Sequence, residues 1–342
     1  MRTSSGWCPF LGDDRLCSIQ KNYGRQLLSA SCSIYPRSLS VVEGAPEGAL
    51  SLSCPEAARN VLLTPDFMAR VCNMQSGDFR TDNFYRLDVG SAGKPHNIFL
   101  PIRNMMISVL LDRSYSLTNR LLMIGYICKR LNSMDARHSQ ATLLASMRNL
   151  YELSRNSLVR AEIEGLPNDP RSRLRTIFGL TDLLMEDEPS SRFQDTFLSF
   201  VAGIGVPVGS PPNSDVESFL RAERDYYFPF IEAFPFILEN YLVNYIFQNL
   251  FPYGRSGSDS FTPQDIFTEY LQMTTLFAWV SGLLVGAAGH HKSAFNAEHV
   301  VKVIQSFSRS VEHYPNVLKS MHRYICSRDL HGLLSMAIIL KH

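Results

Sequence analysis

Apolar residues recur at helical spacing through most of the chain from Ile98 onward. Runs with an apolar residue at every third or fourth position are typical of amphipathic helices. Such runs predict helices over residues 116–131, 140–164, 171–185, 191–202, 215–224, 234–250, 262–288, 296–312, 315–327 and 329–340. Thr262 and Pro263 give the helix over 262–288 a typical start, because threonine caps a helix and proline suits its first turn. The pattern predicts an all-α helical domain over residues 98–342.

The first 64 residues lack this periodicity and contain several turn-forming clusters, among them Gly12-Asp13-Asp14 and Gly44-Ala45-Pro46. Residues 65–97 have the composition of an irregular connector, in which only residues 84–89 are typical of a strand. The expected fold class is therefore mainly α: a cysteine-rich irregular N-terminal lobe, residues 1–64, followed by the all-α helical domain.

The stretch Tyr270–Gly289 carries no formal charge and is long enough to cross a bilayer. It also contains Gln272, two threonines and three glycines, which favours a central helix of a soluble bundle over a membrane span. Within it, Gly282 and Gly286 are spaced to allow close contact between helices.

The composition excludes some classes of function and of stabilising framework. The chain has 33 Lys+Arg against 32 Asp+Glu, a formal charge of +1, so it lacks the basic surface of a nucleic-acid-binding protein. Seven cysteines are an odd number, and Met1–Trp7 has no feature of a secretory signal. A disulfide framework is therefore unexpected, and a cytoplasmic location is expected.

Four of the cysteines lie in the N-terminal 64 residues, at Cys8, Cys17, Cys32 and Cys54. Their spacing is neither that of a zinc ribbon nor that of a compact ferredoxin. Thiolates are nevertheless the ligands preferred by soft metals and iron–sulfur clusters, and the segment is poor in periodic apolar residues that could organise it. The alternative is that the four are small buried hydrophobic residues. The spacing leaves both interpretations open.

The strings around these cysteines resemble those of the flagellin lysine-N-methylases. They are CPFL at residues 8–11, LCSIQ at 16–20, LSASC at 28–32 and LSCPEAAR at 52–59, with ENYLVNYIF at 239–247 and QSFSR at 305–309 further along. The resemblance implies an S-adenosyl-L-methionine-dependent methyltransferase that modifies lysine side chains of flagellin. It also implies a 4Fe-4S cluster on the N-terminal cysteines, with zinc as the alternative metal.

Members of that family usually carry a further cysteine-containing segment ahead of the CPFL string. The resemblance therefore implies a misassigned start or a truncated product, and it leaves open which thiols bind the cluster. A non-catalytic metal-cluster-binding module, or a truncated inactive homologue, is the alternative function. A helical interaction protein with inert cysteines is a third.

A cofactor site of the usual nucleotide-binding kind is not expected. Residues 203–209 are rich in glycine, but they follow a helical run instead of a strand, so the context of a phosphate-binding loop fails. Any S-adenosylmethionine pocket must therefore be unconventional.

Catalytic candidates lie in the aromatic stretch Tyr226–Tyr253, which contains eleven aromatic residues and two carboxylates. On a helix Glu239 shares its face with apolar neighbours, so it is predicted to be a buried carboxylate that needs a partner. A substrate lysine is one possible partner, with Tyr241 and Tyr245 offering ring faces to its ammonium and Glu239 or a tyrosine removing its proton. The alternative is an arginine or lysine from a neighbouring helix, with the aromatic residues simply filling the core.

Overall fold

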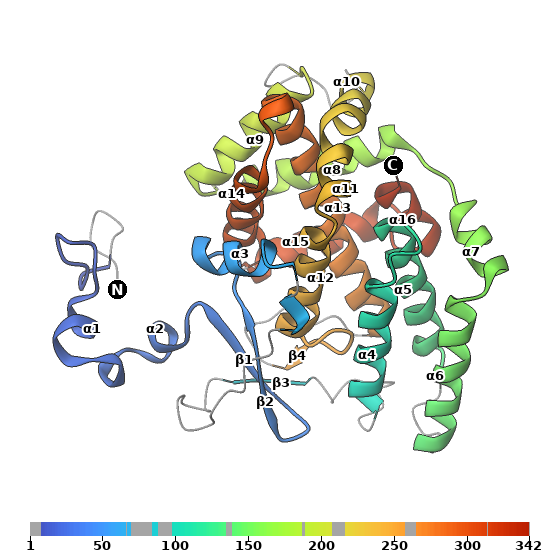
Figure 1. Cartoon of the computed structure of the whole chain (residues 1–342), viewed down its shortest axis with the longest axis horizontal. Helices are drawn as coiled ribbons and strands as arrows, with labels where there is room; N and C mark the ends of the chain where they lie inside the picture. The colour runs from blue at the N-terminus through green and yellow to red at the C-terminus, as the bar shows by residue number, and fades with distance from the viewer. Residues whose placement is uncertain are drawn as a thin grey trace.

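The computed structural model is a helical body with a small sheet at one end and an N-terminal arm that extends away from it (Figure 1). The structure describes residues 8–65, 67–69, 84–87, 98–134, 139–186, 189–206, 216–256, 265–312 and 314–341. Most of the predicted connector therefore lies outside the described residues.

The centre of the body is α13 (Ile266–His291), whose residues Tyr270–Gly289 are all buried. It is long and apolar enough to cross a membrane, but its apolar window lies entirely inside the protein. The prediction of a central bundle helix is thus confirmed. Its start differs from the prediction, because Asp265 caps the helix by accepting a hydrogen bond from the Thr268 amide at 2.8 Å. Thr262 and Pro263 lie outside the described residues.

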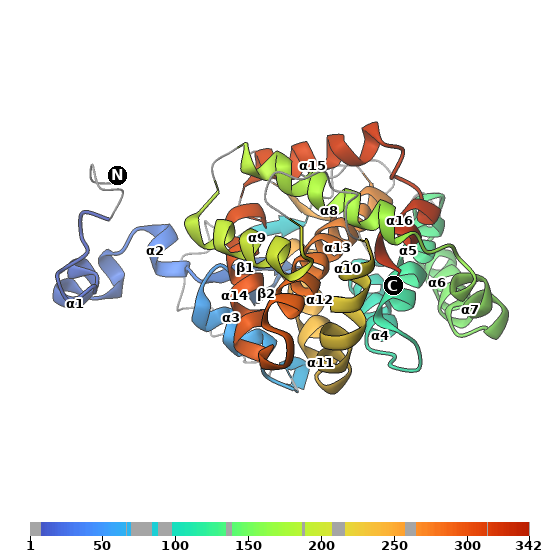
Figure 2. The ribbon, with the colours of Figure 1, turned by 90° about the horizontal axis from the view of Figure 1, so that it is seen from above.

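The other helices of the body pack against α13 or against one another (Figures 1 and 2). They are α4 (Phe99–Leu110), α5 (Leu117–Asn132), α6 (Gln140–Ser154), α7 (Ser157–Glu164), α8 (Pro170–Met185), α9 (Ser191–Gly203), α10 (Val216–Ala222), α11 (Phe228–Ala233), α12 (Phe236–Asn249), α14 (Ala297–Phe307), α15 (Pro315–Ser327) and α16 (Leu333–Leu340). Their apolar faces meet in one continuous core.

The closest helix contact is between α9 and α13. A Cβ atom added to Gly203 would lie 1.8 Å from the Gly286 carbonyl oxygen, and one added to Gly289 would lie 2.4 Å from the Gly203 oxygen. Only glycine allows the two backbones to approach this far. The close contact predicted for Gly286 is therefore confirmed, whereas Gly282 faces the side chain of Ile177.

Two predicted helical runs end where the sequence pattern ends but are interrupted or altered before that point. The run 140–164 is broken after Ser154, because Asn156 accepts hydrogen bonds from the Leu158 and Val159 amides and starts α7. The run 296–312 continues beyond α14 as a π-helical turn, Ser308–Glu312, and a second such turn, Glu223–Tyr227, follows α10. Single π turns are frequent at functional sites.

Residues 8–64 are more regular than predicted. Strands β1 (Arg37–Val42) and β2 (Ala45–Leu50) form an antiparallel hairpin whose turn residues, Glu43 and Gly44, both have positive φ. The helix α3 (Pro55–Leu62) follows. Strands β3 (Tyr85–Leu87) and β4 (Arg255–Ser256) extend the sheet in the order β2-β1-β3-β4, so the strand predicted over 84–89 is confirmed in its described part.

Apolar burial organises much of this predicted lobe, which corrects the expectation of a lobe poor in core residues. Val42, Leu52, Val61 and Leu62 are at most 1% exposed and belong to the same core as the helical body. By contrast, the arm formed by α1 (Ser18–Tyr23), the 3-10 turn Arg25–Leu27 and α2 (Ala30–Ile34) contains no buried residue.

Candidate functional site

A cavity of about 490 Å³ lies where the arm, the sheet and the helical body meet. Its lining residues come from several segments between the N-terminal arm and α15. They are Ser31, Ile34 and Tyr35 of the arm; Arg37, Ser38 and Leu39 of β1; Ser51; Tyr85 and Arg255 of β3 and β4; Tyr245, Gln248 and Asn249 of α12; Gln272 and Leu276 of α13; and Glu312 and Leu318 next to and within α15. The volume is within the range typical of small-molecule sites.

Glu312 supplies a carboxylate to this cavity from the end of the π turn Ser308–Glu312. Burial raises the pKa of Glu312, while the hydrogen bond from Tyr241, the nearby Ser308 hydroxyl and the charge of Arg255 oppose that rise. The Tyr241 hydroxyl donates to Glu312 Oε1 at 2.8 Å. Tyr241 itself is 2% exposed, and burial together with the nearby carboxylate raises its pKa well above the usual value. Tyr241 therefore acts as a donor that holds the carboxylate in place.

Gln272 and Tyr245 form a second polar pair on the cavity wall. Gln272 Nε2 donates to the Tyr245 hydroxyl at 3.2 Å. The amide oxygen of Gln272 is buried and has no hydrogen-bond partner among the described residues, although the residue is only 7% exposed and lines the cavity. An unsatisfied buried acceptor is costly, so this oxygen is suited to receive an N–H group from a ligand.

Arg255 is a buried guanidinium in the cavity lining. Its Nε donates to the Gln248 carbonyl oxygen at 2.5 Å, and its guanidinium lies over the Tyr85 ring at 4.1 Å. Burial lowers the pKa of Arg255, whereas the nearby Tyr85, Tyr245 and Glu269 oppose the decrease. The cavity thus combines a carboxylate, a guanidinium and tyrosine rings.

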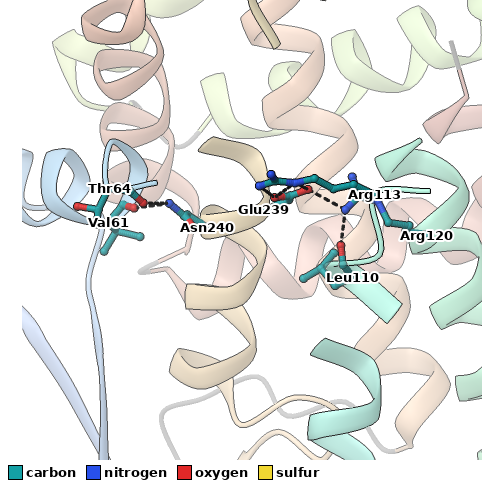
Figure 3. Close-up of polar contacts among 7 residues, drawn as sticks. All are labelled: Val61, Thr64, Leu110, Arg113, Arg120, Glu239 and Asn240. Carbon is teal, nitrogen blue, oxygen red and sulfur yellow. Dashed lines mark hydrogen bonds and ion pairs between the residues drawn. The ribbon is translucent and has the colours of Figure 1, made fainter. Parts of the chain in front are cut away.

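Glu239, the predicted catalytic carboxylate, lies elsewhere, in a cluster of ion pairs (Figure 3). It is 1% exposed, and it accepts hydrogen bonds from Arg113 Nη2 at 2.6 Å and from Arg120 Nη1 at 2.7 Å. Both carboxylate oxygens are therefore occupied by guanidinium groups. This is the alternative that the sequence left open, an arginine partner from neighbouring segments, and it leaves Glu239 without a place for a substrate ammonium.

The structure thus brings two of the three predicted catalytic residues, Tyr241 and Tyr245, to the candidate site and leaves out Glu239. Sequence reasoning missed Glu312, Gln272 and Arg255 as members of one site. Gln272 could have been identified as a candidate from the sequence, since it is a polar residue within an apolar run. The others come from turns and strand ends that carry no periodic pattern, and only the fold brings them to Tyr245.

The four N-terminal cysteines are not gathered into a site. Cys8 and Cys32 are exposed, Cys17 and Cys54 are partly buried, and all four are free thiols. Among the residues that the structure describes, no three His, Cys, Asp or Glu side chains lie close enough to hold one metal ion. This arrangement does not fit a shared iron–sulfur cluster or zinc ion, so the ligand assignment stays a prediction and no chemistry below depends on it.

The helical part of the chain is similar to a known protein family. The model of the FliB lysine N-methylase C-terminal domain matches residues 103–339. Over 64 residues, or 19% of this chain, the chain is 44% identical to the flagellar biosynthetic protein FliU of Salmonella muenchen and to the lysine-N-methylase of Salmonella typhimurium. These alignments span 38% and 16% of the two relatives, respectively. None of the solved structures matches the chain.

Proposed function

The chain belongs to the FliB lysine N-methylase family, and we propose that it transfers a methyl group from S-adenosyl-L-methionine to lysine side chains of flagellin in the cytoplasm. We assign the reaction to the 490 Å³ cavity. The observation that carries this assignment is the carboxylate of Glu312, whose pKa is raised by burial, in a cavity that also presents the unsatisfied amide oxygen of Gln272.

The chemistry requires an uncharged amine. Lysine has a pKa of about 10.4 and is protonated at neutral pH, so the site must accept a proton before the nitrogen can react. In this proposal Glu312 receives that proton, because a carboxyl group with a raised pKa is a better base. The acceptor oxygen of Gln272 and the hydroxyl of Tyr245 orient the remaining N–H groups. The amine lone pair then forms the new N–C bond as the C–S bond of the donor breaks.

The cavity also suits the donor. S-adenosyl-L-methionine supplies an activated methyl group on a sulfonium, next to a carboxylate and an adenine ring. Arg255 and Arg37 would bind the carboxylate, and the rings of Tyr85 and Tyr35 would contact the adenine or the sulfonium. All four residues line the cavity. The two guanidiniums thus give the donor carboxylate its partners, while Glu312 serves the lysine.

The test is the variant Glu312→Gln, assayed with flagellin and methyl-labelled S-adenosyl-L-methionine. Label transfer should fall about 100-fold or more, which is the usual effect of removing a general base. The thermal stability of the variant, by contrast, should not fall. Because the folded-state pKa of Glu312 is raised, its ionisation penalises the native state as the pH rises above the unfolded-state value. At pH 8 the variant should therefore unfold at the same temperature as the unmodified protein or higher.

Glu298→Gln is the matched control, since Glu298 is an exposed glutamate that pairs with Arg59, and neither residue lines the cavity. It should methylate at the normal rate. If Glu312→Gln also does so, the assignment of the base is wrong. If the unmodified protein transfers no label to flagellin at all, the non-catalytic alternative is favoured.

A further inference from the structure

A second cavity, of about 360 Å³, lies on a different face of α12 from the proposed methylation site. Phe236, Glu239 and Asn240 face it, whereas Tyr241 and Tyr245 point toward the first cavity. The spacing i, i+3, i+4 places the first three on one side of the helix. The two cavities share no lining residue.

The polar part of this cavity carries excess positive charge. Arg113 and Arg120 both bind the single carboxylate of Glu239 (Figure 3). Arg120 also donates to the Leu110 carbonyl oxygen at 2.5 Å, so the C-terminal end of α4 offsets part of its charge. The nearby Asp112 pairs with Arg160 at 3.4 Å and does not neutralise the cluster. Two guanidiniums thus face one carboxylate.

The group that faces the cavity is Arg113. Its side chain is 54% exposed, compared with 5% for Arg120, and it lines the cavity while Arg120 does not. Arg113 contacts Glu239 through Nε and Nη2. Its Nη1 makes no hydrogen bond within the part of the chain that the structure describes. A guanidinium presents donors on two edges, so Arg113 can bind a second anion while it stays on Glu239.

Apart from Asn240, whose Nδ2 donates to the Val61 and Thr64 carbonyl oxygens, the rest of the described wall is apolar. This apolar part consists of Pro65, Phe67 and Met68 after α3, Leu111 after α4 and Phe236 of α12. A bare inorganic anion would leave this apolar surface exposed to water. A purely apolar ligand would cover the Arg113 guanidinium without giving it a hydrogen-bond acceptor or a counter-charge. The wall and the cation together suit a ligand with an apolar body and one anionic end.

From this geometry we propose that the second cavity binds a small carboxylate with an aromatic or branched apolar body, its carboxylate on Arg113 and its body against Phe67, Met68 and Phe236. The inference does not depend on the proposed methyltransferase activity. It assigns a separate ligand site to the same chain.

The test is isothermal titration calorimetry of the full chain with 3-phenylpropionate, its neutral isostere 3-phenylpropan-1-ol, and acetate. We expect 3-phenylpropionate to bind at least ~10-fold more tightly than either of the others, since the alcohol lacks the charge and acetate lacks the body. If 3-phenylpropan-1-ol or acetate binds as tightly as 3-phenylpropionate, the proposed site is wrong.

Two variants locate the binding. Arg113→Gln should weaken 3-phenylpropionate binding ~10-fold or more, while Arg120 still pairs with Glu239 and maintains the fold. Arg113→Lys keeps the positive charge but lacks the planar guanidinium. Its affinity for 3-phenylpropionate should therefore lie between those of the unmodified protein and Arg113→Gln. Glu312→Gln, in the other cavity, should bind 3-phenylpropionate as the unmodified protein does. If Arg113→Gln binds normally, or if only Glu312→Gln loses binding, the ligand lies elsewhere and the proposal is wrong.

Discussion

Glu239 carries its charge on a side chain that is 1% exposed, and its partner Arg120 is nearly as deeply buried. Removing one member of such a cluster leaves a buried charge without its counter-charge. We therefore predict that Glu239→Gln lowers the free energy of unfolding by about 3–5 kcal/mol. Urea denaturation followed by circular dichroism measures this as a lower transition midpoint.

Glu298→Gln serves again as the control, because it removes one member of the exposed ion pair with Arg59. Its midpoint should match that of the unmodified protein, since exposed pairs contribute little. If Glu239→Gln behaves like Glu298→Gln, then the cluster around Glu239 does not stabilise the fold.

The sequence predicts that Glu239 is buried, but it does not identify the residue that pairs with it. The helical face fixed the burial, because the residues that share it are apolar. Arg113 and Arg120 are 126 and 119 residues away, and no local pattern relates them to Glu239. The same limit applies to Glu312, which reaches the candidate site through packing across the whole chain.

At the scale of elements, the crossing of α9 and α13 depends on Gly286. A Cβ atom there would lie 2.4 Å from Phe200 Cδ2 and 2.6 Å from Phe200 Cα, and the backbone atom cannot move away. Gly286→Ala should therefore destabilise the protein by about 1–3 kcal/mol or more, as overpacked cores do. Gly332→Ala is the control, because a Cβ atom at Gly332 would lie 3.8 Å from its nearest neighbour, Ser335 Oγ. Its unfolding temperature should match that of the unmodified protein. Equal unfolding temperatures for the two variants would contradict the close crossing.

The start of α14 depends on a histidine in its unprotonated form. The Asn296 amide donates to His299 Nδ1 at 3.2 Å, and the Asn296 side chain accepts from the His299 amide, which completes a capping box. Burial lowers the pKa of His299, as do Lys302 and His290, and His291 stacks on it with ring centroids 3.7 Å apart.

A histidine whose folded-state pKa is lowered contributes stability above the unfolded-state value of about 6.5, and that stability is lost as the pH falls through and below it. We predict that the unfolding temperature falls between pH 7 and pH 5, and that His299→Gln shows a smaller fall. Glutamine at this position can maintain the capping box without titrating. Differential scanning calorimetry at several pH values measures the effect. An equally steep fall in His299→Gln would show that other groups cause it.

The periodic elements were the predictable ones. The helix expected over 315–327 coincides with α15, because proline starts it and its apolar stripe is regular. The break between α6 and α7 was missed, since the apolar pattern continues across it while Asn156 caps the second helix. The hairpin was missed for another reason. Its alternation is short, and its burial comes from contact with α12, which lies about 200 residues further along.

At the scale of the whole molecule, this hairpin links the N-terminal segment to the helical body. Glu47 of β2 forms a salt bridge with the buried Arg103 of α4, with N–O distances of 2.5 and 2.6 Å. Asn244 of α12 pairs with both main-chain groups of Leu50: its Oδ1 accepts from the amide at 3.1 Å, and its Nδ2 donates to the carbonyl at 2.8 Å. The side chain thus acts as a further strand partner at the edge of β2. Because β1 provides Arg37, Ser38 and Leu39 to the first cavity, the same contacts shape the proposed methylation site.

Asn244→Ala tests this connection between fold and site. It leaves the amide and carbonyl of Leu50 without partners at a position where the asparagine is 2% exposed, so we expect a loss of about 1–3 kcal/mol for each group. Hydrogen exchange should accelerate at the Leu50 amide and across the hairpin. S-adenosylhomocysteine, titrated as a probe of the first cavity, should bind more weakly, because the wall formed by β1 is no longer held. Asn60→Ala, which removes an exposed side-chain contact within α3, should change neither measurement. If Asn244→Ala loosens the hairpin but binds S-adenosylhomocysteine normally, the hairpin stabilises the fold without shaping the site.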